Sequence, residues 1–299
     1  MIFNTLTYGK WILCGEQSVL RGHPAIVFPL GNYRLNLSYT STDQALEIIC
    51  QPEHQSSVRK VWKQAWSKDN PPDFVNKGIL RIESSIPIGQ GMGASAALCL
   101  AIARMVCQVS HAPDNIWREA KALEHLFHGQ SSGLDILGSN SQQGAWFERG
   151  QSHPIHMTWR PKWLLTNSNE IGETAKAIQK VQTLCLEKPS FAKSIDNLMH
   201  DSVLLAKQAL ASAKPEITLL QRSMNQSRQC FEDWGLITPN MQKTINFLFQ
   251  QGALAVKPTG SGGGGYLLSL WSDNHIHLMP KGEKHLQITL PIDRKIHQT

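Results

Sequence analysis

The chain has 299 residues, of which 41% are hydrophobic and 17% are charged, a balance typical of a globular protein with a packed core. This length predicts two domains. The formal net charge is +6 at pH 7, and a basic surface can attract nucleic acid, lipid headgroups or small anions. Lysines and arginines are dispersed along the chain, which favours small anionic substrates and argues against nucleic acid as a partner.

No apolar run is long enough to span a membrane and no signal peptide is recognisable, so we expect no membrane partner and a cytoplasmic location. The six cysteines are scattered without paired spacing, as is typical of reduced thiols. The densest basic stretch, residues 59–68, interleaves Trp62 and Trp66 with lysines, a pattern that can bind nucleic acid by stacking. Its apolar residues recur at helical spacing, which favours a helix with one buried face.

The N-terminal residues predict strands separated by a turn. We expect strands at 10–14, from Ala25 onward, at 33–39 and at 45–50, with a turn or short helix at 16–20. Lys10 and Glu16 lie in this region. Taken alone, Lys10 is an ordinary charge near a strand start and Glu16 an ordinary acid in a first helical turn.

The stretch from Pro87 to Ala97 is rich in glycine and is followed by apolar helix formers up to Cys107. Glycine allows a positive φ and a close approach of a ligand. A helix that begins after such a loop presents N–H groups and the positive end of its dipole. The stretch therefore predicts an anion site, most often one for phosphate.

Two common phosphate loops fit this stretch poorly. The nucleotide-triphosphatase loop ends in Gly-Lys-Ser/Thr, and no lysine follows Gly93. The dinucleotide pattern matches by letter but needs a second strand ending in an acid, whereas residues 111–114 form a break and 115–127 predict another helix. A glycine-rich turn that only caps a core helix stays open as an alternative.

The segment from Glu124 to Asp135 contains several polar side chains. Glu124 and His128 share one helix face, and Gly129 is expected to end that helix. A zinc site is disfavoured because the H-E-x-x-H order and a third ligand are missing. Asp135 on its own is compatible with a simple capping role in the next helix.

The C-terminal half predicts helices followed by a strand–loop–strand. A first domain is expected to end near 144–150. Further along, a glycine loop is held at both ends by two predicted strands, and its backbone can admit a ligand. The expected elements are a strand at 163–167, a helix that starts at 172–176, helices at 191–213, 216–234 and 238–251, and the strand–loop–strand at 255–270.

Three segments stand in one order: Gly9-Lys10 with Gly15-Glu16, then 87–97, then 257–265. This order resembles the superfamily of galactokinase, homoserine kinase, mevalonate kinase and phosphomevalonate kinase (GHMP kinases). The family forms are P-G-K-x-x-L-x-G-E-H-x-V-x-x-G, P-x-G-x-G-L-G-S-S-A-A and K-x-T-G-A-G-G-G-G. Residues 124–135 resemble E-x-x-x-H-G-x-P-S-G-x-D, the form found in the mevalonate kinase family, to which the chain is most similar.

The resemblance implies an α+β fold of two domains with the site between them. Residues 1–157 would form an N-terminal mixed α/β domain, like domain 2 of ribosomal protein S5, that binds ATP and Mg²⁺. Residues 158–299 would form a C-terminal ferredoxin-like domain. The implied activity is ATP-dependent phosphorylation of the terminal hydroxyl of mevalonate in isoprenoid biosynthesis, and a homodimer is left open.

The resemblance also implies a role for each matching residue. Asp135 would be catalytic beside the substrate alcohol, with Lys10 paired to it, and Ser95 and Glu124 would hold Mg²⁺. The phosphates of ATP would bind to Gly89, Gly91, Met92, Gly93, Ala94, Ser95 and Ala96, and the substrates would also meet Glu16, Gln17, Thr174, Gly262 and Gly263.

Several residues depart from the family motifs. Gln17 stands where these kinases usually have histidine, and an amide cannot replace an imidazole in every hydrogen bond. Ala94 replaces the first of two serines and Ser131 replaces a proline. Two alternatives therefore stay open: a sibling kinase that acts on another small alcohol, and an inactive relative that only binds nucleotide.

Overall fold

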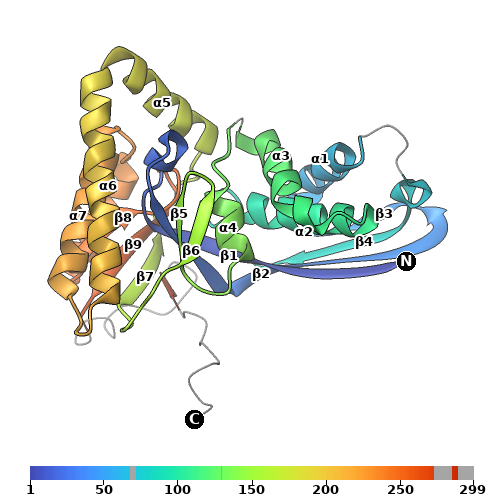
Figure 1. Cartoon of the computed structure of the whole chain (residues 1–299), viewed down its shortest axis with the longest axis horizontal. Helices are drawn as coiled ribbons and strands as arrows, with labels where there is room; N and C mark the ends of the chain where they lie inside the picture. The colour runs from blue at the N-terminus through green and yellow to red at the C-terminus, as the bar shows by residue number, and fades with distance from the viewer. Residues whose placement is uncertain (68–71, 129, 273–284, 289–299) are drawn as a thin grey trace, which may run out of the picture. The chain divides into compact units, whose positions relative to one another are not determined.

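The structure is a computed structural model that describes residues 1–67, 72–128, 130–272 and 285–288 (Figure 1). Two compact units divide the chain. Unit 1 comprises Met1–Lys10, Pro29–Ile88 and Gly93–Ser141, and unit 2 comprises Trp11–Phe28, Gly89–Met92 and the described residues after Ser141. The units alternate along the chain because strands β1 (Ile2–Cys14) and β2 (Ala25–Ala45) run through both. The domain boundary after residue 157 stays a prediction.

The sheet that carries β1 and β2 has six strands within the part of the chain that the structure describes. Its order is β3-β4-β2-β5-β6, and β1 also pairs with β2. In unit 1, β2 is antiparallel to β4 (Lys77–Ser84), and β4 is parallel to β3 (Glu47–Ile49). In unit 2, β5 (Ala145–Glu148) pairs with the start of β2 and with β6 (Gln151–Pro154). The predicted strands at 10–14 and 33–39 are confirmed as parts of the longer β1 and β2.

The described residues of unit 1 include four α-helices: α1 (Gln55–Ala65), α2 (Ala94–Val109), α3 (Ile116–His128) and α4 (Leu134–Asn140). Helix α2 contacts the other three and buries most of its residues. Such a helix, apolar on nearly every side, belongs in a core. Helix α1 buries Val58, Val61, Trp62 and Ala65, so the prediction of one buried face is confirmed.

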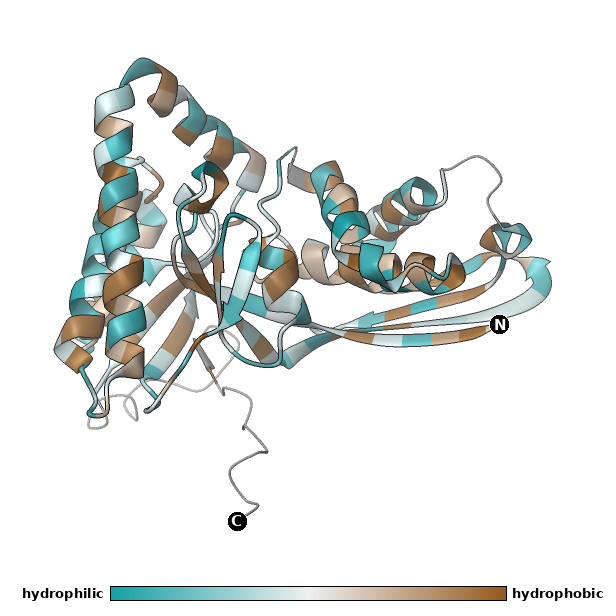
Figure 2. Ribbon diagram, in the orientation of Figure 1, coloured by the Kyte–Doolittle hydropathy of each residue, from teal (hydrophilic) through white to brown (hydrophobic). Residues whose placement is uncertain are grey.

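The described residues of unit 2 form a four-stranded antiparallel sheet of order β10-β7-β9-β8. Helix α7 contacts α6 and strand β8, and α8 contacts β8 and β9. Polar and apolar bands alternate along the helices, as expected where one face is buried (Figure 2). The bounds are β7 (Lys162–Asn167), β8 (Ala255–Pro258), β9 (Tyr266–Trp271), β10 (His285–Gln287), α5 (Thr174–Glu187), α6 (Pro189–Ala211), α7 (Ile217–Asp233) and α8 (Pro239–Gln250).

Short 3₁₀ helices lie in the connections between these strands and helices. The turn expected at 16–20 is η1 (Ser18–Arg21), and the others are η2 (Pro52–His54), η3 (Asp73–Asn76) and η4 (Pro113–Asn115). Gly129, expected to end helix α3, lies outside the described residues. None of the described helices is long and apolar enough to cross a membrane.

Candidate active site

An ion pair joins strand β1 to the first turn of α4 within unit 1. Lys10 Nζ lies 2.8 Å from Asp135 Oδ1, and the two side chains are 2% and 30% exposed. Gly133 begins α4 with a φ of 93°, and a Cβ there would lie 2.5 Å from the Trp117 ring. Glycine is therefore required for the turn that presents Asp135. The pair combines a sealed cation with a carboxylate that solvent can reach.

The glycine that begins helix α2 lies against the Lys10 side chain. Gly93 has a φ of 83°, and a Cβ at this position would come within 2.7 Å of Lys10 Cγ and 3.4 Å of Ser139 Oγ. Ser95 follows in the first turn and is half-buried. The start of α2, with its positive dipole end, thus lies beside Lys10 in unit 1.

Glu124 on α3 is 1% exposed and accepts a hydrogen bond from the Ser131 hydroxyl. Its Oε1 is buried and has no hydrogen-bond partner among the described residues. Burial, and secondly the charge of Asp135, raises the Glu124 pKa to about 8. A buried carboxylate with an unpaired oxygen fits a hard cation, which would favour its charged form. The described residues contain no group of three or more His, Cys, Asp or Glu placed to hold a metal, so Glu124 would supply only part of such a site.

Two glycine segments that are distant in sequence meet in unit 2. A Cβ on Gly91 would lie 3.4 Å from the Thr259 carbonyl oxygen, and one on Gly265 would lie 2.7 Å from the Gln90 carbonyl oxygen. The Gly172 N–H donates to the Gly89 carbonyl at 3.2 Å. These backbones approach too closely for side chains, which is the physical reason for glycine in both segments.

The residues expected at the acceptor pocket fall into two sets within unit 2. Gln17 Nε2 donates to the Ser261 carbonyl at 2.9 Å, and Thr174 Oγ1 lies 3.2 Å from Ser261 Oγ. The Glu16 carboxylate instead accepts a hydrogen bond from Lys257 Nζ, and both side chains are at most 1% exposed. Glu16 is therefore closed to direct contact with a ligand in this structure.

The glycines after Ser261 differ in their surroundings. A Cβ on Gly262 would meet Leu236 and Phe231 at 2.9 Å, whereas a Cβ on Gly263 would have no atom of the described residues within 4 Å. The Gly263 N–H donates to the Leu236 carbonyl at 2.8 Å. One side of the loop thus packs against α7 and the residues that follow it, and the space at Gly263 is open.

The sequence assigned no role to several residues whose side chains the structure places near the predicted site residues. Ser131 holds Glu124, Ser139 lies next to Gly93 and Lys10, and Lys257 pairs with Glu16. Lys257 opens the third motif, which was a usable signal. Ser139 gave none beyond its position four residues after Asp135, on the same face of α4.

Comparison with known proteins identifies the family. The GHMP kinases N terminal domain matches residues 57–140 and the GHMP kinases C terminal domain matches residues 193–276. Mevalonate kinase of Archaeoglobus fulgidus is 30% identical over 285 residues, covering 92% of each chain. Mevalonate kinase of Pyrococcus horikoshii is 27% identical, covering 87% of this chain and 86% of that one.

Solved structures share the fold. L. major mevalonate kinase in complex with R-mevalonate superposes with a TM-score of 0.74 at 22% identity, covering 91% of this chain and 88% of that one. Lactococcus lactis galactokinase complexed with galactose gives a TM-score of 0.74 at 12% identity, covering 93% and 87%. Both the paired domain matches and the full-length similarity lead to one conclusion: this chain belongs to the GHMP kinase family.

Proposed function

We propose that this chain transfers the γ-phosphoryl group of ATP to the terminal hydroxyl of mevalonate, giving 5-phosphomevalonate and ADP. The chain matches relatives named mevalonate kinase, and these matches cover most of the relatives' length. The single observation that carries the chemistry is the Lys10–Asp135 pair at 2.8 Å, which holds a carboxylate against a buried cation and leaves the carboxylate partly open.

Asp135 orients the alcohol and receives its proton. The alcohol oxygen attacks the γ-phosphorus, the bond to the β–γ bridging oxygen breaks, and ADP leaves with that electron pair. In a loose transition state the proton moves late, so a weak base is sufficient. Lys10 offsets negative charge on the transferring group. The 30% exposure of Asp135 supports direct contact with a substrate.

The glycine segment from Gly89 to Ala96 holds the phosphates. Positive φ values at Gly89, Gly91 and Gly93 turn the backbone into a cradle, and the start of α2 supplies the dipole. Met92 and Ala94 contribute backbone rather than side-chain chemistry. On the strand–loop–strand of unit 2, Gly262 lets the loop pack closely against Leu236 and Phe231, and the open space at Gly263 supports ligand approach there.

Ser95 and Glu124 are the proposed Mg²⁺ ligands. The unpaired, buried Oε1 of Glu124 fits a hard cation, and Mg²⁺ in kinases is commonly held by one or two protein oxygens together with substrate phosphates. When bound, Mg²⁺ neutralises charge on the phosphate oxygens. Ser131 fixes the second oxygen of Glu124, so the free one has a defined direction.

Gln17 and Thr174 are the proposed acceptor contacts. Gln17 is 3% exposed, and its Oε1 has no hydrogen-bond partner within the described part of the chain. An unpaired amide oxygen is ready to accept a hydrogen bond from a hydroxyl of the substrate. Glu16 contributes indirectly, because its carboxylate is hydrogen-bonded by Lys257.

We place the enzyme in a reducing compartment, the cytoplasm. None of the six cysteines is in a disulfide, and Cys14, Cys99, Cys107 and Cys230 are buried. Burial raises the pKa of the Cys14 and Cys99 thiols, which keeps them protonated and poorly reactive.

A coupled assay that detects ADP tests the activity. The purified chain is incubated with ATP, Mg²⁺ and, in separate reactions, mevalonate, phosphomevalonate, homoserine or galactose. We expect turnover with mevalonate to exceed the others by about 10²-fold or more, since a site built for one set of hydroxyls rejects analogues that leave its polar groups unpaired. Preferred use of another alcohol would establish a sibling kinase, and no turnover with any would establish an inactive relative.

A further inference from the structure

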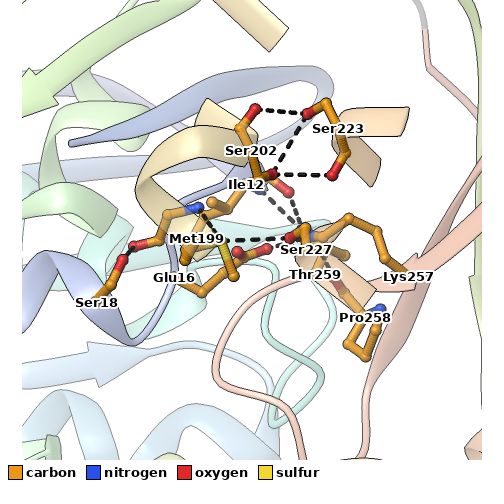
Figure 3. Close-up of polar contacts among 11 residues, drawn as sticks. Ile12, Glu16, Ser18, Met199, Ser202, Ser223, Ser227, Lys257, Pro258 and Thr259 are labelled. Atoms are coloured by element: carbon orange, nitrogen blue, oxygen red, sulfur yellow. Dashed lines mark hydrogen bonds and ion pairs between the residues drawn. The ribbon is translucent and has the colours of Figure 1, made fainter. Parts of the chain in front are cut away.

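A buried polar network lies next to residues 257–265, the third glycine segment, in unit 2 (Figure 3). Lys257 Nζ donates both to Glu16 Oε1 and to the Pro258 carbonyl. The ammonium also lies 5.4 Å from the centre of the Phe231 ring. With side chains 0% and 1% exposed, Lys257 and Glu16 form a fully sealed ion pair.

The side chains around this pair are largely apolar, or their polar groups are hydrogen-bonded to one another. Ser202 and Ser223 bond to each other's carbonyl oxygens across α6 and α7 at 2.9 and 2.7 Å. Met199 Sδ accepts from the Gly15 N–H at 3.2 Å (Figure 3). Sealing two charges in such a place costs desolvation, and apolar residues of similar volume often stabilise a fold equally well. Stability alone therefore does not explain why the pair is present.

The pair is one of three links between the same two segments. Ile12 and Thr259 exchange hydrogen bonds, N–H to Oγ1 and Oγ1 to carbonyl, both at 2.9 Å. Glu16 then bonds Lys257, and beyond it Gln17 Nε2 bonds the Ser261 carbonyl at 2.9 Å. The links do not follow one order along both segments, since residues 12, 16 and 17 contact 259, 257 and 261; together they fix the position, or register, of residues 12–17 against 257–261.

That register sets where the third glycine segment lies. Thr259 and Gly260 contact Gly91, as the 3.4 Å from a Gly91 Cβ to the Thr259 oxygen indicates. The Phe231 ring below Lys257 also packs at Gly262. A shift of the pair would therefore be passed to the backbone facing the phosphate loop and, through Ser261, to Gln17.

We propose that Glu16 and Lys257 are positioning residues of the phosphoryl transfer: their sealed ion pair locks the third glycine segment and Gln17 in register. Neither residue contacts substrate. The kinetic part of the proposal rests on the proposed kinase function, and the structural part does not. The role assigned to Glu16 thus differs from the direct substrate contact that the family resemblance implies.

The test compares E16Q, K257M and the double variant E16M/K257M. Each single change leaves the other buried residue without its counter-charge, so we expect a lower melting temperature and a lower kcat. The double variant removes both charges, and we expect its melting temperature to return close to that of the wild type. Its kcat should stay about 10²-fold low, because a displacement of about 1 Å costs that much, while KM for ATP changes little.

Amide hydrogen exchange provides a readout that does not need turnover. We expect the amides of residues 260–265 to exchange faster in E16M/K257M than in the wild type. The matched control is R21M/D196L, which removes a second long-range ion pair of unit 2 whose partners lie on η1 and α6. The control should leave both kcat and exchange at 260–265 unchanged.

A conservative variant covers the case in which the double variant fails to fold. E16D keeps the charge and shortens the side chain by one methylene, so it should fold, yet lose about 10-fold in kcat and exchange faster at 260–265. Wild-type kcat and exchange in E16M/K257M or in E16D would overturn the proposal. If the wild type does not phosphorylate mevalonate, the proposed function fails, and exchange still decides the positioning role.

Discussion

Two lysine–carboxylate pairs differ sharply in the solvent exposure of their side chains. Lys10 and Asp135 in unit 1 are 2% and 30% exposed, whereas Lys257 and Glu16 in unit 2 are 0% and 1% exposed. Lys10 and Glu16 belong to the same N-terminal motif, on strand β1 and in the turn after it. The chain thus builds an open pair and a sealed pair from one short stretch.

The difference separates chemistry from positioning. The open carboxylate of Asp135 can exchange solvent for a substrate hydroxyl without breaking the fold. In the sealed pair, loss of one partner leaves an uncompensated buried charge, which costs about 3–5 kcal/mol. We therefore expect changes in the open pair to act mainly on turnover and changes in the sealed pair to act on stability as well.

The largest expected effect is on turnover in D135N. Asparagine keeps the size of the side chain but cannot accept a proton from the alcohol, so kcat should fall by about 10²–10⁴-fold. The affinity for ATP should stay near that of the wild type, whereas the melting temperature should fall, because the buried Lys10 ammonium loses the charge of its partner. Steady-state kinetics and nucleotide titration measure these quantities.

The control for D135N is D114N, which changes an exposed aspartate in η4 of the same unit. It should leave kcat unaltered. Turnover of D135N close to that of the wild type would contradict the assignment of the open pair to the chemistry.

The open pair was predictable from the sequence because its residues lie in recognisable motifs, and so was the glycine-rich nature of both loops. The sealed pair was not, since the Glu16–Lys257 contact joins residues 241 positions apart and is created only by tertiary folding. Strand β2 was predicted in pieces because Pro29 and Gly31 suggest a break, yet it continues through both units. Strand β4 was not predicted, although buried Leu80 and Ile82 alternate with exposed Arg81 and Glu83 as in a strand with one buried face.

The second effect concerns the glycine beside the open pair. G93A and G150A both place a side chain at a φ near +80°, 83° and 82°, and share a strain of about 1 kcal/mol. Only at Gly93 does the new Cβ clash, 2.7 Å from Lys10 Cγ, whereas Gly150 has open space. We expect G93A to lose about 10–100-fold in kcat through displacement of Lys10, and G150A to lose none.

Thermal unfolding accompanies these kinetics. The melting temperature of G93A should fall further than that of G150A, since the clash adds to the shared strain. Equal losses of stability and activity in the two variants would show that Lys10 moves aside without consequence.

The third effect is a pH dependence that arises next to the open pair. Because burial and Asp135 raise the Glu124 pKa from 4.5 to about 8, the folded protein keeps this proton between those pH values while the unfolded chain has lost it. The stability that the neutral form provides is fully present below pH 4.5 and is lost as the pH rises towards 8. In metal-free buffer, urea unfolding of the wild type should show this decline.

E124Q is the matched variant because glutamine cannot ionise. Its free energy of unfolding should vary less between pH 5 and pH 8 than that of the wild type, with no change in the m-value. The same pH slope in both proteins would remove Glu124 as the origin of the decline.

The smallest expected effect compares two buried serines, one in each region. Ser139 Oγ, next to the open pair, has no hydrogen-bond partner among the described residues, whereas Ser202 in the sealed region donates to the Ser223 carbonyl at 2.9 Å. S139A removes an unsatisfied hydroxyl and should leave stability unchanged or raise it by about 1 kcal/mol. S202A breaks a satisfied pair and should lower it by about 1–2 kcal/mol. Urea unfolding measures both, and a loss in S139A as large as in S202A would mean that the hydroxyl beside Lys10 is bonded in solution.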